Sequence, residues 1–322
     1  MNNEVLKDNI SIVTVCDNNY VMLLATLLKS IERNNKSKRE IDFYIVNDNI
    51  TRKNQVKFEK SFNNDLINIK WLIMADLIPN GARVPTDKST YPLNIYIRLF
   101  IPYFMPQEIE RVIYLDVDMV VLGNIGDLWN TDLSGNIIGA VQDTFGTAFY
   151  GIKNHKDLGI SEDSKYFNSG MLLIDTIEWR KNGITEDIIV CLQNNTEFAQ
   201  YPDQYGLNVV FANKWFEMDE KWNTYTYKDE EDPLLIHYIG YKPIYKDYSG
   251  KKEYLDLFFY YLNLTQWKGM TPVSKYFRYA LKFKTRVKKK LTKLLSFSKK
   301  KNTVWIIIFF LLFPILNFVA HL

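Results

Sequence analysis

The stretch Val112-Ile113-Tyr114-Leu115-Asp116-Val117-Asp118 places two carboxylates at the end of an apolar run. A short apolar run is typical of a buried strand, and a second one, residues 119–122, follows directly. Because Asp116 and Asp118 are two residues apart, they would project from the same face of a regular strand. Two carboxylates in buried surroundings need compensation, which a divalent cation with oxygen ligands would supply. The alternative is a bulged strand end whose carboxylates cap backbone amides.

Strand and helix patterns alternate on both sides of this stretch. We expect strands at residues 10–16, 41–46, 67–74, 112–115, 137–141 and 171–174, and helices at 21–31, 51–62 and 91–104. Such alternation predicts an α/β fold with a mostly parallel central sheet and helices on both faces. Ligands of these sheets bind outside the carboxyl ends of the strands, where Asp116 and Asp118 would lie. The absence of G-x-G-x-x-G and G-x-x-x-x-G-K-[ST] argues against dinucleotide-binding and P-loop proteins.

The charge of the 322-residue chain is divided between an acidic body and a basic tail. Net charge is +3, but thirteen of the 40 Lys and Arg residues, and none of the 37 Asp and Glu residues, follow Asp256. Residues 1–256 are therefore net −10 and the remainder +13. An acidic body argues against nucleic acid as a partner. Cys16 and Cys191 are too few for a disulfide framework and are expected as buried thiols in a reducing compartment.

The C-terminal segment has the composition of a membrane attachment. Residues 303–320 carry no charge and are about long enough to cross a bilayer, and residues 282–301 before them are cationic. A basic amphipathic helix suits anionic membrane lipids and marks the cytoplasmic side. We therefore expect a body at 1–256, a basic amphipathic helical segment at 257–301 and an apolar membrane-associating segment at 302–322. The alternatives are a C-terminal helix packed on the body and a surface-lying or re-entrant segment, which Pro314 and Asn317 allow. Residues 1–9 are polar, without a signal segment, so the body would remain in the cytosol.

Three histidines are available as a third metal ligand. His321 ends the tail, and His155 lies in a polar loop where we expect it to be solvated. His237 follows a short apolar run and precedes Gly240 and Lys242, so it has the right chemistry to complete a cation site and hold phosphate nearby. The alternative is an ordinary core or surface histidine.

Six short motifs occur in order between residues 10 and 246. They are Asp17-Asn-Asn-Tyr20, Ile95-Tyr-Ile-Arg-Leu99, Tyr114-Leu-Asp-Val-Asp118, Phe167-Asn-Ser-Gly-Met-Leu-Leu-Ile-Asp175, Asp203-Gln204 and His237-Tyr-Ile-Gly-Tyr-Lys-Pro243. Together they resemble glycosyltransferase family 8, the lipopolysaccharide galactosyl- and glucosyltransferases related to glycogenin. Several motifs in the correct order are far more specific than a lone Asp-x-Asp.

The resemblance implies a GT-A type fold, the nucleotide-diphospho-sugar transferase fold, that uses a UDP-sugar and Mn²⁺, with Mg²⁺ as the alternative metal. Asp116, Asp118 and His237 would bind the metal, because mixed carboxylate and imidazole ligation suits Mn²⁺ better than Mg²⁺. Asp17, Asn19 and Tyr20 would contact the nucleoside, with Tyr20 stacked on uracil, and Arg98 would contact the donor sugar and phosphate. The sugar hydroxyls would be bound by Asp143, Asn168, Asp203 and Gln204. Lys242, in the same segment as Gly240, would bind the β-phosphate. The ordinary alternatives are helix caps for Asp143 and Asp203, a turn for Asn168 and a surface ion pair for Arg98.

This chain departs from the family pattern in two places. The histidine segment usually runs His-x-x-Gly-x-x-Lys-Pro-Trp, whereas here one residue is missing between Gly240 and Lys242, and Ile244 stands in place of Trp. Asn18 stands where many relatives have a second Asp. The placement of Lys242 is therefore less secure than that of the Asp pair.

The family transfers sugars with retention of anomeric configuration. A double displacement needs a carboxylate under the anomeric carbon, and the matching residue is the amide Gln204, with Asp203 and Asp143 beside it in the catalytic centre. We therefore expect front-face attack by the acceptor hydroxyl. The donor would be UDP-galactose or UDP-glucose, and the acceptor an oligosaccharide, glycolipid or cell-surface polysaccharide at the cytoplasmic face of a bacterial inner membrane. The alternatives are a sugar-1-phosphate nucleotidyltransferase, whose Gly-rich basic loop is not matched here, and an inactive membrane-bound scaffold that binds sugar nucleotides.

Overall fold

The computed structural model describes residues 9–62, 65–78, 93–274 and 276. It divides into two compact units, Met1–Lys242 with Gly250–Met270, and Pro243–Ser249 with Thr271–Leu322. In the second unit, Tyr245 and Val273 form an isolated parallel bridge. The predicted cationic and apolar segments beyond residue 276 lie outside the described residues. Among the helices that are described, none combines the length and apolar character that a membrane crossing requires.

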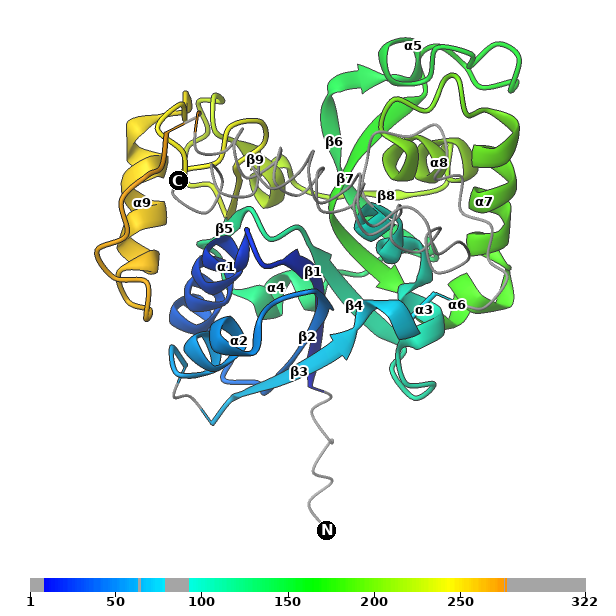
Figure 1. The fold of residues 1–322 in the computed structure, drawn as a ribbon. Helices are drawn as coiled ribbons and strands as arrows, with labels where there is room; N and C mark the ends of the chain where they lie inside the picture. The colour runs from blue at the N-terminus through cyan, green and yellow to red at the C-terminus, as the bar shows by residue number, and fades with distance from the viewer. Residues whose placement is uncertain (1–8, 63–64, 79–92, 275, 277–322) are drawn as a thin grey trace, which may run out of the picture. The chain divides into compact units, whose positions relative to one another are not determined.

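The first unit contains a seven-stranded sheet in the order β3-β2-β1-β4-β7-β6-β8 and a three-stranded sheet in the order β5-β10-β9 (Figure 1). The strands are β1 (Ile10–Asp17), β2 (Ile41–Asp48), β3 (Ile67–Ile73), β4 (Arg111–Leu115), β5 (Met119–Val121), β6 (Ile138–Thr147), β7 (Lys165–Asp175), β8 (Phe216–Glu217), β9 (Thr224–Tyr225) and β10 (Leu235–His237). In the larger sheet, only β7 runs antiparallel to its neighbours, β4 and β6. The prediction of a mostly parallel central sheet is confirmed.

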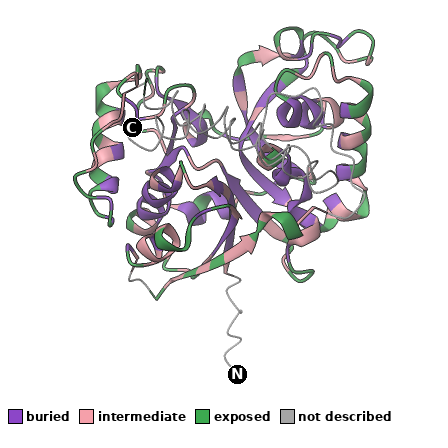
Figure 2. Cartoon of the chain, in the orientation of Figure 1, coloured by how far each residue is buried: buried purple, intermediate pink, exposed green. Residues whose placement is uncertain are grey.

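Several α-helices pack on the larger sheet, and the structure describes nine in all. They are α1 (Val21–Asn34), α2 (Arg52–Glu59), α3 (Ile101–Phe104), α4 (Ile125–Trp129), α5 (Ala148–Gly151), α6 (Thr176–Lys181), α7 (Ile184–Asn194), α8 (Pro202–Val210) and α9 (Lys252–Leu262). Buried side chains of α3, α6, α7 and α8 form one apolar cluster with the sheet, and α1 packs on β1, β5 and α9. Figure 2 shows the central strands as largely buried, which is why β1 reads as a continuous apolar run.

One predicted helix differs from the structure. The helix expected at residues 91–104 is a 3₁₀ helix, Leu93–Phe100, followed by the single turn α3. Pro102 lies at the start of α3, and because proline lacks an N–H and restricts the residue before it, a continuous α-helix cannot pass this point. The second apolar run also forms a strand, β5, and this strand belongs to the smaller sheet.

Candidate active site

The Asp-x-Asp segment is a turn between two sheets, and the assumption that it lies on a regular strand is wrong. β4 ends at Leu115 and β5 begins at Met119. The backbone N–H of Asp116 donates to the carbonyl of Gly170 on β7 at 2.8 Å, and the carbonyl of Asp118 accepts from Tyr238 N–H at 2.8 Å. The backbone at Asp116 is therefore bonded to β7 and the backbone at Asp118 to Tyr238, the residue after His237, so strand alternation does not set the positions of the two carboxylates.

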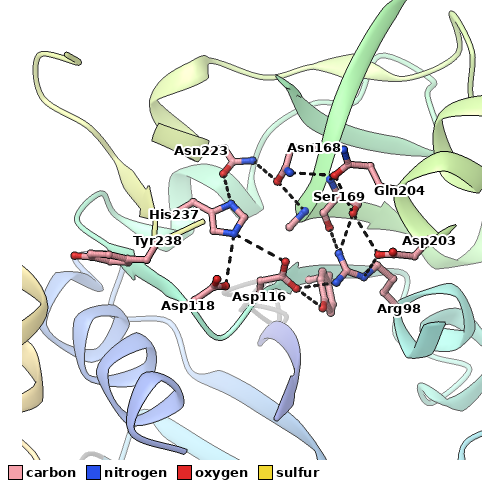
Figure 3. A network of polar contacts seen from close by, with 12 residues as sticks. Arg98, Asp116, Asp118, Asn168, Ser169, Asp203, Gln204, Asn223, His237 and Tyr238 are labelled. Atoms are coloured by element: carbon pink, nitrogen blue, oxygen red, sulfur yellow. Dashed lines mark hydrogen bonds and ion pairs between the residues drawn. The ribbon is translucent and has the colours of Figure 1, made fainter. Parts of the chain in front are cut away.

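Strand pairing brings His237 to the same turn. β10 runs antiparallel to β5, with Met119 opposite His237, so Asp118 adjoins the imidazole. His237 Nε2 lies 3.5 Å from Asp118 Oδ1 and 4.0 Å from Asp116 Oδ2 (Figure 3). One ligand atom from each residue lies within 4.8 Å of the others. Bonds of about 2.0–2.6 Å would separate neighbouring ligand atoms by roughly 2.8–3.7 Å, so small shifts suffice to hold one divalent cation.

The chemistry and the space around these three residues fit that cation. Two carboxylates and an imidazole are a donor set for a divalent transition metal. Gly170 leaves the space free, since a Cβ there would lie 2.5 Å from His237 Cε1 and 3.0 Å from Asp116 Oδ2. The three metal ligands predicted from the sequence are brought together, and metal binding itself stays a prediction.

Asp116 presents one oxygen to this cluster because the other is already bound. Its Oδ1 accepts hydrogen bonds from Tyr114 Oη at 2.6 Å and Arg98 Nη2 at 2.9 Å, which leaves Oδ2 towards His237. The Arg98 guanidinium also lies 4.6 Å from the centre of the Tyr114 ring. Burial acts to lower the pKa of Arg98, but the neighbouring carboxylates, Asp116 first, outweigh it and raise that pKa, so the charge is retained.

Arg98 is buried and contacts several polar partners, and it is not part of a surface ion pair. Its Nη1 donates to the Ser169 carbonyl at 2.6 Å and to Ser169 Oγ at 3.0 Å. Its Nε lies 3.0 Å from Asp203 Oδ2, although the N–H is not aligned for a hydrogen bond. Burial raises the pKa of Asp203, and the Arg98 charge opposes this. The expected contact of Arg98 with a donor sugar stays a prediction.

Lys242 reaches the Asp-x-Asp turn despite the shortened histidine segment. Its ammonium donates to the carboxylate of Asp118 and to the Tyr238 carbonyl, the latter at 2.8 Å. Burial acts to raise the pKa of Asp118, but Lys242 and His237 beside it hold that pKa well below its usual range. Asp118 is therefore an anion at neutral pH, and contact of Lys242 with phosphate stays a prediction.

The four residues predicted to hold the sugar also lie close together: Asp143, Asn168, Asp203 and Gln204. Gln204, in the first turn of α8, donates from Nε2 to Asp143 Oδ2 on β6 at 2.8 Å. Its Oε1 accepts from Asn168 Nδ2 and from Ser169 N–H on β7, both at 3.0 Å. Asp203 precedes Gln204 in the same turn. Asp143, Asn168 and Gln204 therefore bind one another, and Asp203 accepts from Ser169 Oγ at 3.4 Å, so a helix cap or a simple turn does not fully account for these side chains.

The loop after β1 is built by Asp17. Its Oδ1 accepts from the N–H groups of Asn19 at 2.8 Å and Tyr20 at 3.1 Å, which sets the start of α1. Burial raises the pKa of Asp17, and these bonds oppose the shift. Asn18 Oδ1 accepts from Thr51 N–H at 3.0 Å and Asn54 Nδ2 at 2.9 Å, so it ties the loop to α2. Nucleoside contacts of this loop stay predictions.

A cavity of about 440 Å³ adjoins these groups. Its lining includes ten of the thirteen predicted site residues: Tyr20, Arg98, Asp116, Asp118, Asn168, Asp203, Gln204, His237, Gly240 and Lys242. One cavity therefore contacts Tyr20 of the loop after β1, the cluster of Asp116, Asp118 and His237, and the group that contains Asn168 and Gln204.

The prediction of a solvated His155 is wrong, and Asn223 is a polar residue of the site that the sequence did not indicate. His155 is buried at 5% exposure, with Nδ1 3.1 Å from the Ile160 carbonyl, because its polar loop folds back over it. Asn223 joins His237 Nδ1 and Asn168 Oδ1, each at 2.9 Å. A single asparagine outside any quoted motif carries no signal of such a role; the pairing of β9 with β10 would have been needed to find it.

A mostly parallel sheet with an Asp-x-Asp turn and a histidine beside one cavity is the arrangement of the GT-A glycosyltransferase fold. The sequence model of glycosyl transferase family 8 matches residues 11–243. The chain belongs to this family.

Relatives and solved structures agree with this assignment. General stress protein A of Bacillus subtilis (strain 168) is 28% identical over 283 residues, which cover 81% of this chain and 96% of that protein. Lipopolysaccharide glucosyltransferase WaaO of Escherichia coli (strain K12) is 31% identical over 207 residues, 59% of this chain and 60% of that protein. The galactosyltransferase LgtC, solved with donor and acceptor sugar analogs, matches with a TM-score of 0.64 and 22% identity over 80% of this chain and 96% of that one, which bears on the fold alone.

Proposed function

We propose that the chain is a retaining hexosyltransferase that moves glucose or galactose from a UDP-sugar to an envelope glycan or glycolipid. The observation that carries the proposal is the cluster of Asp116, Asp118 and His237, whose ligand atoms lie within 4.8 Å of one another in the lining of one cavity. The same cavity is lined by Asn168 and Gln204. The name of WaaO, a lipopolysaccharide glucosyltransferase, supports an envelope acceptor.

The metal-binding residues would hold Mn²⁺ against the donor diphosphate. When bound, the ion would supply a Lewis acid that neutralises the diphosphate and stabilises departing UDP. Lys242 brings a second positive charge to the same end of the cavity, and Tyr20 in its lining would stack on the uracil. Arg98 keeps Asp116 oriented through its bond to Oδ1, so that Oδ2 remains available to the ion.

The reacting sugar would lie against Gln204. An amide is a poor nucleophile, so the acceptor hydroxyl would attack on the face from which UDP leaves, with its proton passing to the phosphate. The Gln204 amide is held by Asp143 and by Asn168, which fixes its position and suits it to bind the sugar rather than to form a bond with it. If Gln204→Ala leaves transfer unaffected while Asp118→Ala abolishes it, this role is wrong.

Attachment of the chain to a membrane is proposed from the sequence alone. The predicted boundary between a catalytic body at 1–256 and a basic segment at 257–301 falls inside α9, so the basic segment would begin beyond that helix, and residues 302–322 would form the membrane-associating segment. Positive charge beside an apolar span attracts anionic lipids and would hold the body at the cytoplasmic face of a bacterial inner membrane.

Hydrolysis of the donor tests the proposed function. The protein is incubated with UDP-glucose or UDP-galactose with and without Mn²⁺, and free hexose is measured. We expect slow release that requires Mn²⁺ and is lost in Asp118→Asn. The matched control is Asp175→Asn, the same change in the carboxylate that caps α6, where the amide oxygen still accepts from Glu178 N–H. UTP formation from UDP-hexose and pyrophosphate would instead indicate a nucleotidyltransferase, and Mn²⁺-dependent UDP binding without hydrolysis an inactive scaffold.

A further inference from the structure

The amide side chains of Gln204, Asn168 and Asn223 are linked by hydrogen bonds, and backbone N–H groups determine which amide atom of each side chain donates and which accepts. The N–H of Ser169 lies 3.0 Å from one side-chain atom of Gln204, and because a backbone N–H can only donate, that atom is the amide oxygen. The Gln204 nitrogen then faces the Asp143 carboxylate at 2.8 Å, where only a donor fits. The orientation of Gln204 is therefore assigned without ambiguity.

A second backbone donor fixes Asn168 in the same way. The N–H of Gly170 donates to Asn168 Oδ1 at 3.0 Å, so Asn168 Nδ2 is the atom that meets the Gln204 oxygen at 3.0 Å. Two independent backbone anchors thus agree on the direction of this chain. Asn168 Oδ1 has one further contact, Asn223 at 2.9 Å, and this atom of Asn223 must be the nitrogen that donates to it (Figure 3).

The same logic determines the tautomer of His237. With its nitrogen facing Asn168, Asn223 presents Oδ1 to His237 Nδ1 at 2.9 Å. A carbonyl oxygen only accepts, so Nδ1 must carry the proton, and in the neutral ring Nε2 then holds the lone pair. That lone pair faces Asp118 Oδ1 at 3.5 Å and Asp116 Oδ2 at 4.0 Å. Asn223 and His237 are each only 4% exposed, which leaves little room for water to replace the bond.

Strand pairing holds the two partners in place. Asn223 ends a 3₁₀ turn, Glu220–Asn223, directly before β9, and β9 pairs with β10 so that Tyr225 lies opposite His237. The distance between Asn223 and the imidazole is thus set by backbone bonds rather than by flexible loops.

We propose that Asn223 is a positioning residue that keeps His237 in the Nδ1–H tautomer and joins the metal ligand to the sugar-binding amide Asn168. The proposal rests on the metal site of the proposed function. A second partner that orients a ligating histidine usually matters for metal affinity by about 10- to 100-fold. The link to Asn168 connects the residues that would hold the diphosphate to those that would hold the hexose.

Two substitutions separate the two bonds of Asn223. Asn223→Leu removes both, and we expect Mn²⁺ affinity, measured by electron paramagnetic resonance of the free ion, to fall about 10- to 100-fold. Asn223→Asp keeps an acceptor for Nδ1–H but loses the donor to Asn168, so Mn²⁺ affinity is retained while the KM for UDP-hexose hydrolysis rises. Asn154→Leu is the matched control. Asn154 is 5% exposed, donates to Asn195 at 2.8 Å and accepts from Tyr205 at 2.8 Å outside the cavity lining, so Mn²⁺ affinity stays at the wild-type value.

A spectroscopic measurement tests the tautomer without metal or activity. Long-range ¹H–¹⁵N correlation on metal-free protein labelled with ¹⁵N-histidine distinguishes the tautomers at mildly alkaline pH, and His237→Gln identifies the resonance. We expect Nδ1–H in the wild type. The assignment is overturned if the wild-type ring carries its proton on Nε2, or if Asn223→Leu binds Mn²⁺ as tightly as the wild type. It is also overturned if Asn223→Asp loses as much Mn²⁺ affinity as Asn223→Leu, or if its KM for UDP-hexose is unchanged. If the wild type binds no Mn²⁺, the proposed function fails, and the tautomer of His237 alone tests the role of Asn223. The tautomer is also the deciding measurement if Asn223→Leu does not fold.

Discussion

Gly170 is the position where one added methyl group should most directly disturb the cluster of Asp116, Asp118 and His237. A Cβ at Gly170 would lie 2.5 Å from His237 Cε1, 2.9 Å from Asn168 Oδ1 and 3.0 Å from Asp116 Oδ2. Contacts this short force the imidazole or the carboxylate to move. Overpacking of this kind costs about 1–3 kcal/mol. If that cost falls on the metal-bound state, Gly170→Ala lowers Mn²⁺ affinity by about 5- to 150-fold, since 1.4 kcal/mol is about tenfold.

The matched control for Gly170→Ala is Gly139→Ala in the adjacent strand β6. A Cβ at Gly139 would lie 2.7 Å from Leu133 Cδ2 and 3.1 Å from Met218 Cε, the ends of flexible side chains away from the cavity lining. Circular dichroism without metal checks that both variants fold, and we expect only Gly170→Ala to lose Mn²⁺ affinity by electron paramagnetic resonance. Wild-type Mn²⁺ affinity in Gly170→Ala, or an equal loss of affinity in Gly139→Ala, would show that the space at Gly170 is not needed for the metal.

Three further predictions concern stability, the loop after β1 and a thiol. Trp179 is fully buried and donates from Nε1 to Thr185 Oγ1 at 2.9 Å, so Trp179→Ala should reduce the free energy of unfolding in urea by about 3–5 kcal/mol; an unchanged midpoint would contradict this. Asn18→Ala removes the acceptor for Thr51 N–H and should weaken UDP binding in calorimetry, whereas Asn18→Asp keeps an oxygen there and should bind like the wild type; equal weakening would show that the bond is unimportant. Burial raises the pKa of Cys191 to about 11, so the thiol stays protonated at neutral pH and its alkylation by iodoacetamide should accelerate up to that pH; a plateau near the ordinary thiol pKa would argue against burial.

The elements that could be predicted are those with strong local patterns. β1, β2 and β4 are apolar runs buried on both faces, and α1 repeats apolar residues at helical spacing, so their positions follow from the sequence with small errors at the ends. The region around Pro102 was predicted less well, because the choice between a 3₁₀ and an α-helix depends on packing against the sheet as well as on local propensity.

The candidate site divides in the same way. The kinds of ligand were readable from the motifs, since Asp116, Asp118 and His237 are recognisable by type and order. The surroundings of His155 were not, because a polar loop reads as solvated whether or not it folds back on the protein.

By itself, the sequence determined the chemistry: two carboxylates and an imidazole, an amide in place of a nucleophile, and an acidic body with a basic tail. Only the tertiary structure decided that the Asp-x-Asp turn passes between two sheets, that β10 brings His237 beside Asp118, and that Asn223 sets the direction of the imidazole. The physical reason is that these contacts depend on the register of backbone hydrogen bonds between strands distant in the chain. Local periodicity specifies which face of a strand is buried, but not which strand pairs with which.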